Sequence, residues 1–166
     1  MKIVDGFEHR TGTHCGSTAM ADLLRHAGAE LSEAMVFGLG AGLGFFYIEN
    51  DAFDPSRMIM GRSWGLEETA AELLGADLVP HRTNDPDEAW MRVRDAIDDD
   101  LPVLIQCDLV HLPYWNARTP FNGHRIVAAG YDEASREVLV ADTHFDGLQR
   151  VSYEDLARAR ASSAPP

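Results

Sequence analysis

Apolar residues recur every three or four positions in several parts of the chain, which is the spacing of one helix face. The first such run begins at Cys15 and ends before Gly28, a residue suited to closing a helix. A second, shorter helix is predicted behind Ser32, whose hydroxyl can cap it. The spacing returns over residues 66–74 and stops at Gly75. The N-terminal half is therefore predicted to be mainly helical.

Two further helices have clear start signals. Asp85 can cap a helix, Pro86 fits its first position, and Glu88 offers a capping-box carboxylate, so a helix is predicted from there through Ile97. The segment YEDLARAR follows Ser152, another capping residue, and predicts the last helix of the chain.

The pattern changes after residue 100. The segments LPVLIQC, HRIVAAGYD and EVLVADTH are rich in β-branched residues and are separated by turn-like stretches, which predicts a mostly antiparallel sheet. Upstream, the glycine-rich GLGAGLG predicts a loop that leads into a strand, FFYIE, and residues 77–82 predict one more short strand. The glycines do not match GxGxxG, and no GK[ST] follows them, so no nucleotide site is predicted.

These elements indicate an α+β domain, with a helical N-terminal half packed on the sheet of the C-terminal half. A chain of 166 residues with 45% hydrophobic residues suffices for one such core. We expect one catalytic domain over residues 1–160. The remaining residues, 161–166 (ASSAPP), are expected to be a tail that leads into a linker and an absent second domain.

Charge and cysteine content narrow the classes of function. A net charge of -13 argues against nucleic acid as a partner and suits a cationic small-molecule substrate, although solubility alone also explains it. No apolar run is long enough for a signal peptide or a membrane span, so a soluble, cytoplasmic protein without a membrane partner is expected. Cys15 and Cys107 belong to no CxxC pair, so both are expected to be free thiols.

Cys15 is the candidate nucleophile. Its predicted place at a helix N-terminus favours the thiolate, because free N–H groups and the helix dipole stabilise an anion there. Gly16 leaves room for a substrate carbonyl, and the N–H groups at the helix start can donate to an oxyanion. Cys107 instead lies inside an apolar run and is predicted to be an inert buried thiol. The alternative for Cys15 is that it is only a small apolar residue of the core, without a catalytic role.

A base and a group to orient it follow in the order expected of a cysteine enzyme. His124 opens the predicted strand HRIVAAGYD, and Asp142 ends the strand that returns beside it. In an antiparallel hairpin the two side chains can be cross-strand neighbours. Asp142 can then accept one ring N–H of His124 while the other ring nitrogen faces the thiol.

Taken together, several segments resemble one known family. HCGSTAMADLL, VFGLGAGLGFFY, the LPY motif at residues 112–114, and GHRIVAAGYD followed by VAD are similar to the N-terminal domain of the butirosin-biosynthesis acyltransferase family. That family is papain-like and related to the double-glycine bacteriocin-processing cysteine peptidases. The resemblance covers nearly the whole chain. It implies a papain-like fold and transfer of an acyl group from a carrier-protein phosphopantetheine thioester to an amine, in the type case on an aminoglycoside, with no bound cofactor.

The same resemblance assigns the site residue by residue. Cys15 matches the family nucleophile, His124 the base, and Asp142 the third member, where papain has Asn. Processing peptidases carry a Gln upstream of the cysteine that helps to bind the oxyanion, and the matching position here is His9. His9 is thus the candidate oxyanion donor, unless the oxyanion site is made of backbone alone.

Four further residues are candidates for substrate binding, against the alternative that they are loop or packing residues: His14, Asp108, Tyr114 and Trp115. A metal site is not predicted, because the remaining histidines show no HExxH or similar ligand spacing.

Three functions fit these residues. The first is a cysteine acyltransferase with an acyl carrier protein as partner, although a carrier protein that is itself acidic needs a local basic patch to dock on a chain of this charge. The second is a cysteine peptidase or amidase, whose first half-reaction is identical. The third is a non-catalytic module with the same fold, which an intact Cys-His-Asp set disfavours.

Overall fold

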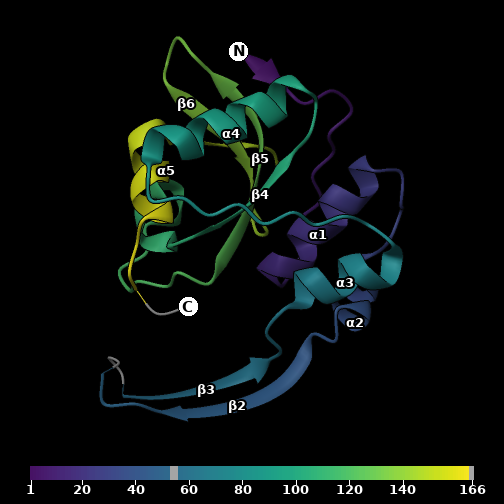
Figure 1. The fold of residues 1–166 in the computed structure, drawn as a ribbon, viewed down its shortest axis with the longest axis vertical. Helices are drawn as coiled ribbons and strands as arrows, with labels where there is room; N and C mark the ends of the chain where they lie inside the picture. Colours follow the sequence, from purple (N-terminus) through teal and green to yellow (C-terminus); the bar gives the residue numbers. More distant parts are fainter. Residues whose placement is uncertain (53–55, 165–166) are drawn as a thin grey trace.

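The computed structural model describes residues 1–52 and 56–164, and it has the predicted α+β arrangement, with helices on both faces of one sheet (Figure 1). In chain order the helices are α1 (Cys15–His26), α2 (Glu33–Leu39), α3 (Leu66–Leu74), α4 (Pro86–Asp98) and α5 (Tyr153–Arg160). The strands are β1 (Lys2–Ile3), β2 (Leu43–Glu49), β3 (Arg57–Arg62), β4 (Val103–Cys107), β5 (His124–Asp132), β6 (Glu137–Ala141) and β7 (Gln149–Ser152). Two single turns of 3-10 helix, Leu109–His111 and Pro113–Trp115, follow β4.

The main sheet is antiparallel and centres on β5. One edge of β5 pairs with β6, which in turn pairs with β7; the other edge pairs with β4 and, further along, with β1. The β4 register sets Cys107 opposite His124, at the end of the sheet where β5 begins. The same end receives the residue that follows Ala141 of β6, because β5 and β6 run antiparallel.

Side chains of β5 alternate between two apolar layers, as a strand covered on both faces requires. Ile126 and Ala128 belong to the core that includes residues of α4 and α5. Val127 instead packs with Ala19 of α1. The sheet therefore fixes α1, with Cys15 at its first residue, relative to the start of β5.

The predicted caps are largely confirmed. Ser32, Asp85 and Ser152 each accept a hydrogen bond from a backbone N–H in the first turn of the helix that follows. Gly75 ends α3 with a φ of 66°, a left-handed conformation that costs glycine little. The capping box is not formed, because the N–H of Asp85 donates to the Thr83 hydroxyl, and that hydroxyl donates to Glu88.

The strands are predicted less completely than the helices. The predicted strand over residues 77–82 is wrong: those residues pair with no strand, and most of them are exposed. Gly38 belongs to α2 rather than to a loop. The FFYIE strand is β2, and its partner β3 forms with it a separate hairpin that projects from the body (Figure 1).

The chain stays packed against the body shortly after α5. Asn122 donates to the carbonyl of Ser162 over 2.8 Å, and the Ser162 hydroxyl donates to Asp108 over 2.7 Å, so packing continues past residue 160. The last two residues of the predicted tail, 165–166, lie outside the described residues. Throughout the described part of the chain, each helix is too short or too polar to cross a membrane.

Candidate active site

Cys15 is the first residue of α1, as the sequence predicts. His14 caps the helix by accepting the N–H of Ser17 at Nδ1 over 3.2 Å. The N–H groups of Cys15 and Gly16 donate to no other group of residues 1–52 and 56–164, so both are free at the positive end of the helix dipole. The helix N-terminus that carries the Cys15 sulfur therefore has two backbone donors without a protein acceptor in the described part of the chain.

His124 and Asp142 come together at the end of the sheet. The Nε2 atom of His124 lies 2.9 Å from each carboxylate oxygen of Asp142, and both side chains are buried. The imidazole also lies close enough to the Cys15 thiol for each group to shift the pKa of the other. Since Nε2 is held by Asp142, Nδ1 is the ring nitrogen left for the sulfur.

Asp142 is itself held by two aromatic side chains of the loop before β5. The Tyr114 hydroxyl and the Trp115 indole N–H both donate to Oδ2, over 2.8 and 2.7 Å. The Trp115 ring also packs edge-on against the His124 ring, with 5.3 Å between centroids. Tyr114 and Trp115, predicted to line a substrate pocket, thus support the orienting carboxylate.

The charges of the site favour a thiolate-imidazolium pair. Burial alone would raise the pKa of Cys15, but the hydrogen bond and charge of His124 and the backbone of Arg125 outweigh it, and the pKa is lowered. Burial would lower the pKa of His124, but Asp142 and Cys15 raise it to about 9. Burial opposes ionisation of Asp142, yet its donors hold its pKa below the usual range. These shifts all favour the charged forms of the three groups over the neutral ones.

His9 occupies a different environment from the one predicted. Its Nδ1 lies 2.6 Å from Oδ2 of Asp22 and its Nε2 lies 3.1 Å from the carbonyl oxygen of Phe145. With both ring nitrogens engaged, His9 has no free N–H for an oxyanion. The structure therefore contradicts the prediction that His9 is the oxyanion donor, which leaves the alternative of a site made of backbone N–H groups.

Glu67 and Arg125 form an ion pair beside the nucleophile that sequence reasoning missed. Glu67 Oε1 lies 2.9 Å from Arg125 Nε, and the same oxygen would lie 2.8 Å from a Cβ on Gly16. A side chain at Gly16 would therefore require the Glu67 carboxylate to shift. No motif marks Glu67 in the sequence, because it reads as an ordinary acidic residue in the first turn of a helix.

The other candidates lie in structural positions. Asp108 is buried and accepts the N–H groups of Val110 and Phe121 as well as the Ser162 hydroxyl, so it holds its own loop together. Burial, with Arg62 nearby, lowers the pKa of His14 to about 4, so this cap is neutral. Nowhere in residues 1–52 or 56–164 do three His, Cys, Asp or Glu side chains converge in a way that could hold a metal ion.

The two cysteines should differ sharply in reactivity. We expect brief treatment with iodoacetamide near neutral pH to label Cys15, since its thiolate is stabilised and partly exposed. Cys107 is fully buried, and burial raises its pKa, so it should stay unmodified. Peptide mapping by mass spectrometry measures both sites, with Cys107→Ala as the control that should retain wild-type labelling. Preferential labelling of Cys107 would reject the assignment.

Comparisons with known proteins agree with this fold. A solved structure described as a C39-like peptidase from Bacillus anthracis superposes with a TM-score of 0.67 at 19% identity, covering 96% of this chain and 91% of that one. The peptidase domain of Streptococcus ComA, a bifunctional ABC transporter involved in quorum sensing, matches with a TM-score of 0.46 at 17% identity, covering 95% and 90%.

No curated protein matched the sequence. A family model described as "Butirosin biosynthesis protein H, N-terminal" matches residues 14–143, a span that begins one residue before Cys15 and ends one residue after Asp142. The match covers most of the chain and contains the whole Cys15-His124-Asp142 arrangement. The chain therefore belongs to the family of butirosin biosynthesis protein H N-terminal domains, with a papain-like α+β fold.

Proposed function

We propose that this domain is a cysteine acyltransferase that carries an acyl group on Cys15 and passes it to an amine. The observation that carries the proposal is the connected chain of Cys15, His124 and Asp142 at the N-terminus of α1. The family match supports acyl transfer in a biosynthetic pathway over peptide cleavage, because the matching family is described by butirosin biosynthesis.

The residues can perform both half-reactions. The Cys15 thiolate attacks the carbonyl carbon of a thioester, and the free N–H groups of Cys15 and Gly16 stabilise the resulting oxyanion. The carbon-sulfur bond to the donor breaks as His124 gives its proton to the departing thiol. An amine then attacks the acyl-enzyme, its proton passes to His124, and the Cys15 thiolate leaves.

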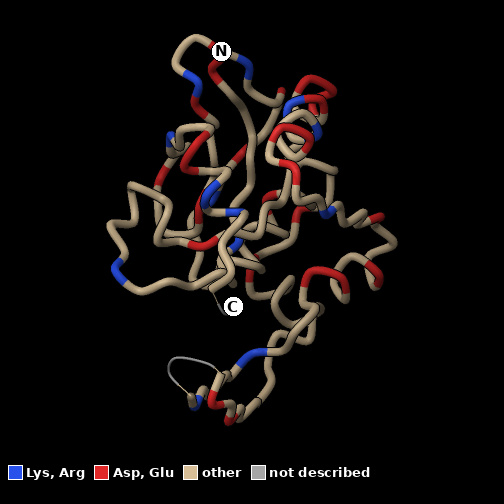
Figure 2. Tube along the Cα trace, turned by 60° about the vertical axis from the view of Figure 1, so that its left-hand side comes forward, with Lys and Arg blue, Asp and Glu red and all other residues tan. Residues whose placement is uncertain are grey.

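Charge supports an amine as acceptor. Acidic residues are spread along the trace of the chain (Figure 2), which carries 27 Asp and Glu against 14 Lys and Arg. A protonated polyamine would be attracted by this field. A phosphopantetheine thioester on an acyl carrier protein is the proposed donor.

The test is the intact mass of the protein over time after addition of a simple acyl thioester. We expect a single acyl adduct in the wild type and in Cys107→Ala, and none in Cys15→Ser, because only Cys15 combines a stabilised thiolate with a base. An adduct that persists in Cys15→Ser, or one that is lost in Cys107→Ala, would contradict the proposal.

Addition of an aminoglycoside separates transfer from hydrolysis. A transferase should lose its adduct faster with the amine than without it and should release an amide. Holding the acceptor near the acyl carbon can lower the barrier by about 7–11 kcal/mol, so a second domain that supplies part of the acceptor site would leave this chain acylated but slow to transfer. Rapid turnover of the thioester to the free acid, at one rate with and without the amine, would assign the domain as a hydrolase.

A further inference from the structure

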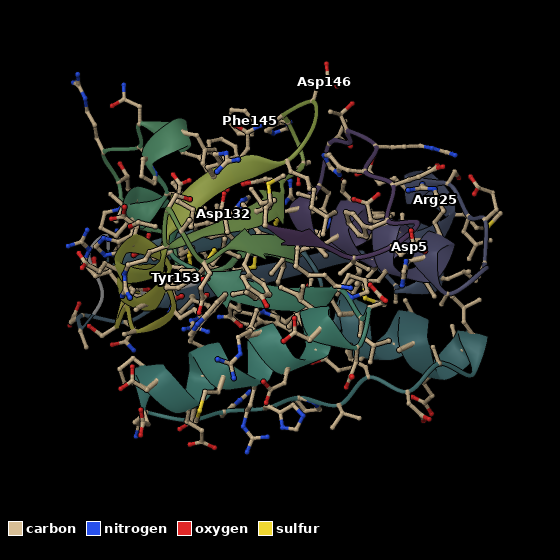
Figure 3. The ribbon with its side chains drawn as sticks, turned by 90° about the horizontal axis from the view of Figure 1, so that it is seen from above. Asp5, Arg25, Asp132, Phe145, Asp146 and Tyr153 are labelled. Carbon is tan, nitrogen blue, oxygen red and sulfur yellow. The ribbon has the colours of Figure 1, made fainter. Side chains whose placement is uncertain are left out.

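His9 joins the N-terminal segment to α1 and to the loop that follows β6. Its side chain is 5% exposed, and that of Asp22, which it contacts, is 1% exposed. The loop side of the contact is the carbonyl of Phe145, three residues after Asp142. Figure 3 shows Phe145 beside Asp146 on this loop at the top of the view, and Arg25 of α1 on the right.

Both partners of the His9 ring are hydrogen-bond acceptors. The Asp22 carboxylate faces Nδ1, and the Phe145 carbonyl faces Nε2. A neutral imidazole has one N–H, so one of its nitrogens would present a lone pair to an oxygen inside the protein. Only the doubly protonated ring can donate to both oxygens. A buried ring nitrogen whose lone pair faces an oxygen would make no hydrogen bond and would cost free energy.

The extra proton belongs to His9 rather than to Asp22. The second carboxylate oxygen of Asp22 accepts Arg25 Nη1 over 2.8 Å and the backbone N–H of Arg10 over 3.3 Å. Donors on that oxygen favour the ionised carboxylate. Arg25 is also near Glu30, which balances part of its charge, so the Asp22 anion is left to stabilise a cation at His9.

We propose that His9 is a buried imidazolium that positions Asp142, by tying the loop of residues 142–145 to α1 through Asp22. The ring holds the backbone of this loop, and the Phe145 side chain packs edge-on against Tyr114 and Trp115, the two donors to the Asp142 carboxylate. His9 is therefore a positioning residue, not a catalytic one. The inference rests on the proposed function only in taking Asp142 as the group that orients His124.

The geometry sets the direction of the pH dependence. Burial by itself lowers the pKa of His9, but Asp22 and the backbone carbonyls of Phe145 and Asp142 raise it above the ordinary value. A raised pKa means that the stabilisation is complete below an ordinary histidine pKa of about 6.5 and is lost as pH rises through the folded value. The hydrogen bonds of His9 to Asp22 and Phe145 should therefore weaken toward alkaline pH.

The first test reads the protonation state of His9 directly, without any assay of activity. Nitrogen-15 NMR of histidine-labelled protein, about one pH unit above the ordinary histidine pKa of about 6.5, should show two ring N–H groups for His9. Loss of this signal in His9→Gln assigns it. The signal should also change to that of a neutral ring in Asp22→Asn, which removes the anion. An unprotonated ring nitrogen on wild-type His9 at this pH would overturn the proposal.

The second test reads positioning through the pH profile of Cys15 alkylation. In His9→Gln, a displaced Asp142 should support the His124 cation less, so Cys15 should ionise at a pH higher by about one unit and react about tenfold more slowly below it. His26→Gln is the matched control, since the His26 ring has one bonded nitrogen, which meets the Asp100 carbonyl over 2.9 Å. A His9→Gln profile equal to that of the wild type would show that His9 holds no part of the site. If the NMR and alkylation results are as expected but thioesters do not acylate Cys15, the proposed function is contradicted and the positioning role of His9 is not.

Discussion

Replacing His124 by alanine should lower the rate of Cys15 acylation by a thioester by about 10²–10⁴. The imidazolium supplies the charge that lowers the pKa of Cys15 and the proton that the departing donor thiol needs. Without the imidazole, Cys15 still lies at the N-terminus of α1, but neither Asp142 nor the helix can replace His124 as its acid and base. Single-turnover acylation, followed by intact mass, measures this loss.

Alkylation by iodoacetamide should fall less than acylation in the same variant. Alkylation needs the thiolate but no acid, and a cysteine with an ordinary pKa is only a few per cent ionised at neutral pH, so the loss should be about 30-fold. His81→Ala, which removes an exposed histidine far along the chain from the triad, should leave both rates unchanged. Equal losses in the two reactions would show that His124 acts only on the charge of Cys15.

The fold was predictable where local chemistry and packing agree. Helices α1 and α3, the capped starts at Ser32, Asp85 and Ser152, and the strands β4, β5 and β6 all carry their apolar pattern in sequence. The hairpin of β2 and β3 does not alternate cleanly, because Phe45, Phe46 and Tyr47 are all exposed. Residues 77–82 have a strand-like composition but no neighbouring strand edge to pair with, and composition alone cannot supply one.

The part of the candidate site that depends on chain order and on the pairing of neighbouring strands could be predicted from the sequence. Cys15, His124 and Asp142 follow from a helix start and one antiparallel hairpin, both local features. The donors to Asp142 come from a loop whose residues show no periodicity, so Tyr114 and Trp115 could be named but not given their role. His9 and Glu67 depend on contacts across more than ten residues with Asp22 and Arg125, which no spacing rule contains.

Asp142→Asn should be nearly as damaging as the loss of His124, although an amide keeps the shape of the side chain. Three donors converge on this carboxylate: His124 Nε2–H, the Tyr114 hydroxyl and the Trp115 N–H. If the asparagine NH2 takes the place of Oδ2, it faces the Trp115 N–H, and two donors then point at each other, because the indole N–H can only donate. If the NH2 takes the place of Oδ1 instead, it donates to Nε2 of His124. The ring proton then moves to Nδ1, the nitrogen that must be free to accept the proton of the thiol.

Either arrangement costs both stability and activity. A buried donor without its acceptor lowers the free energy of unfolding by about 1–3 kcal/mol. The wrong tautomer, together with loss of the carboxylate charge, should lower the acylation rate by about 10²–10⁴. Thermal unfolding and single-turnover acylation of the same preparation measure the two effects, and Asp146→Asn, an exposed change on the same loop, should alter neither.

The pH dependence of this variant distinguishes an electrostatic role of Asp142 from mere packing. Burial lowers the pKa of His124, and the value of about 9 in the wild type depends on Asp142 as well as Cys15. Because that pKa is raised on folding, the ion pair contributes stability that is complete below about 6.5 and is lost as pH rises through the folded pKa. The difference in melting temperature between wild type and Asp142→Asn should therefore be largest at about pH 6.5 and shrink as pH rises toward about 9. A difference that stays constant across this range would mean that Asp142 supports the site through shape and hydrogen bonds alone, with His124 neutral in the resting protein.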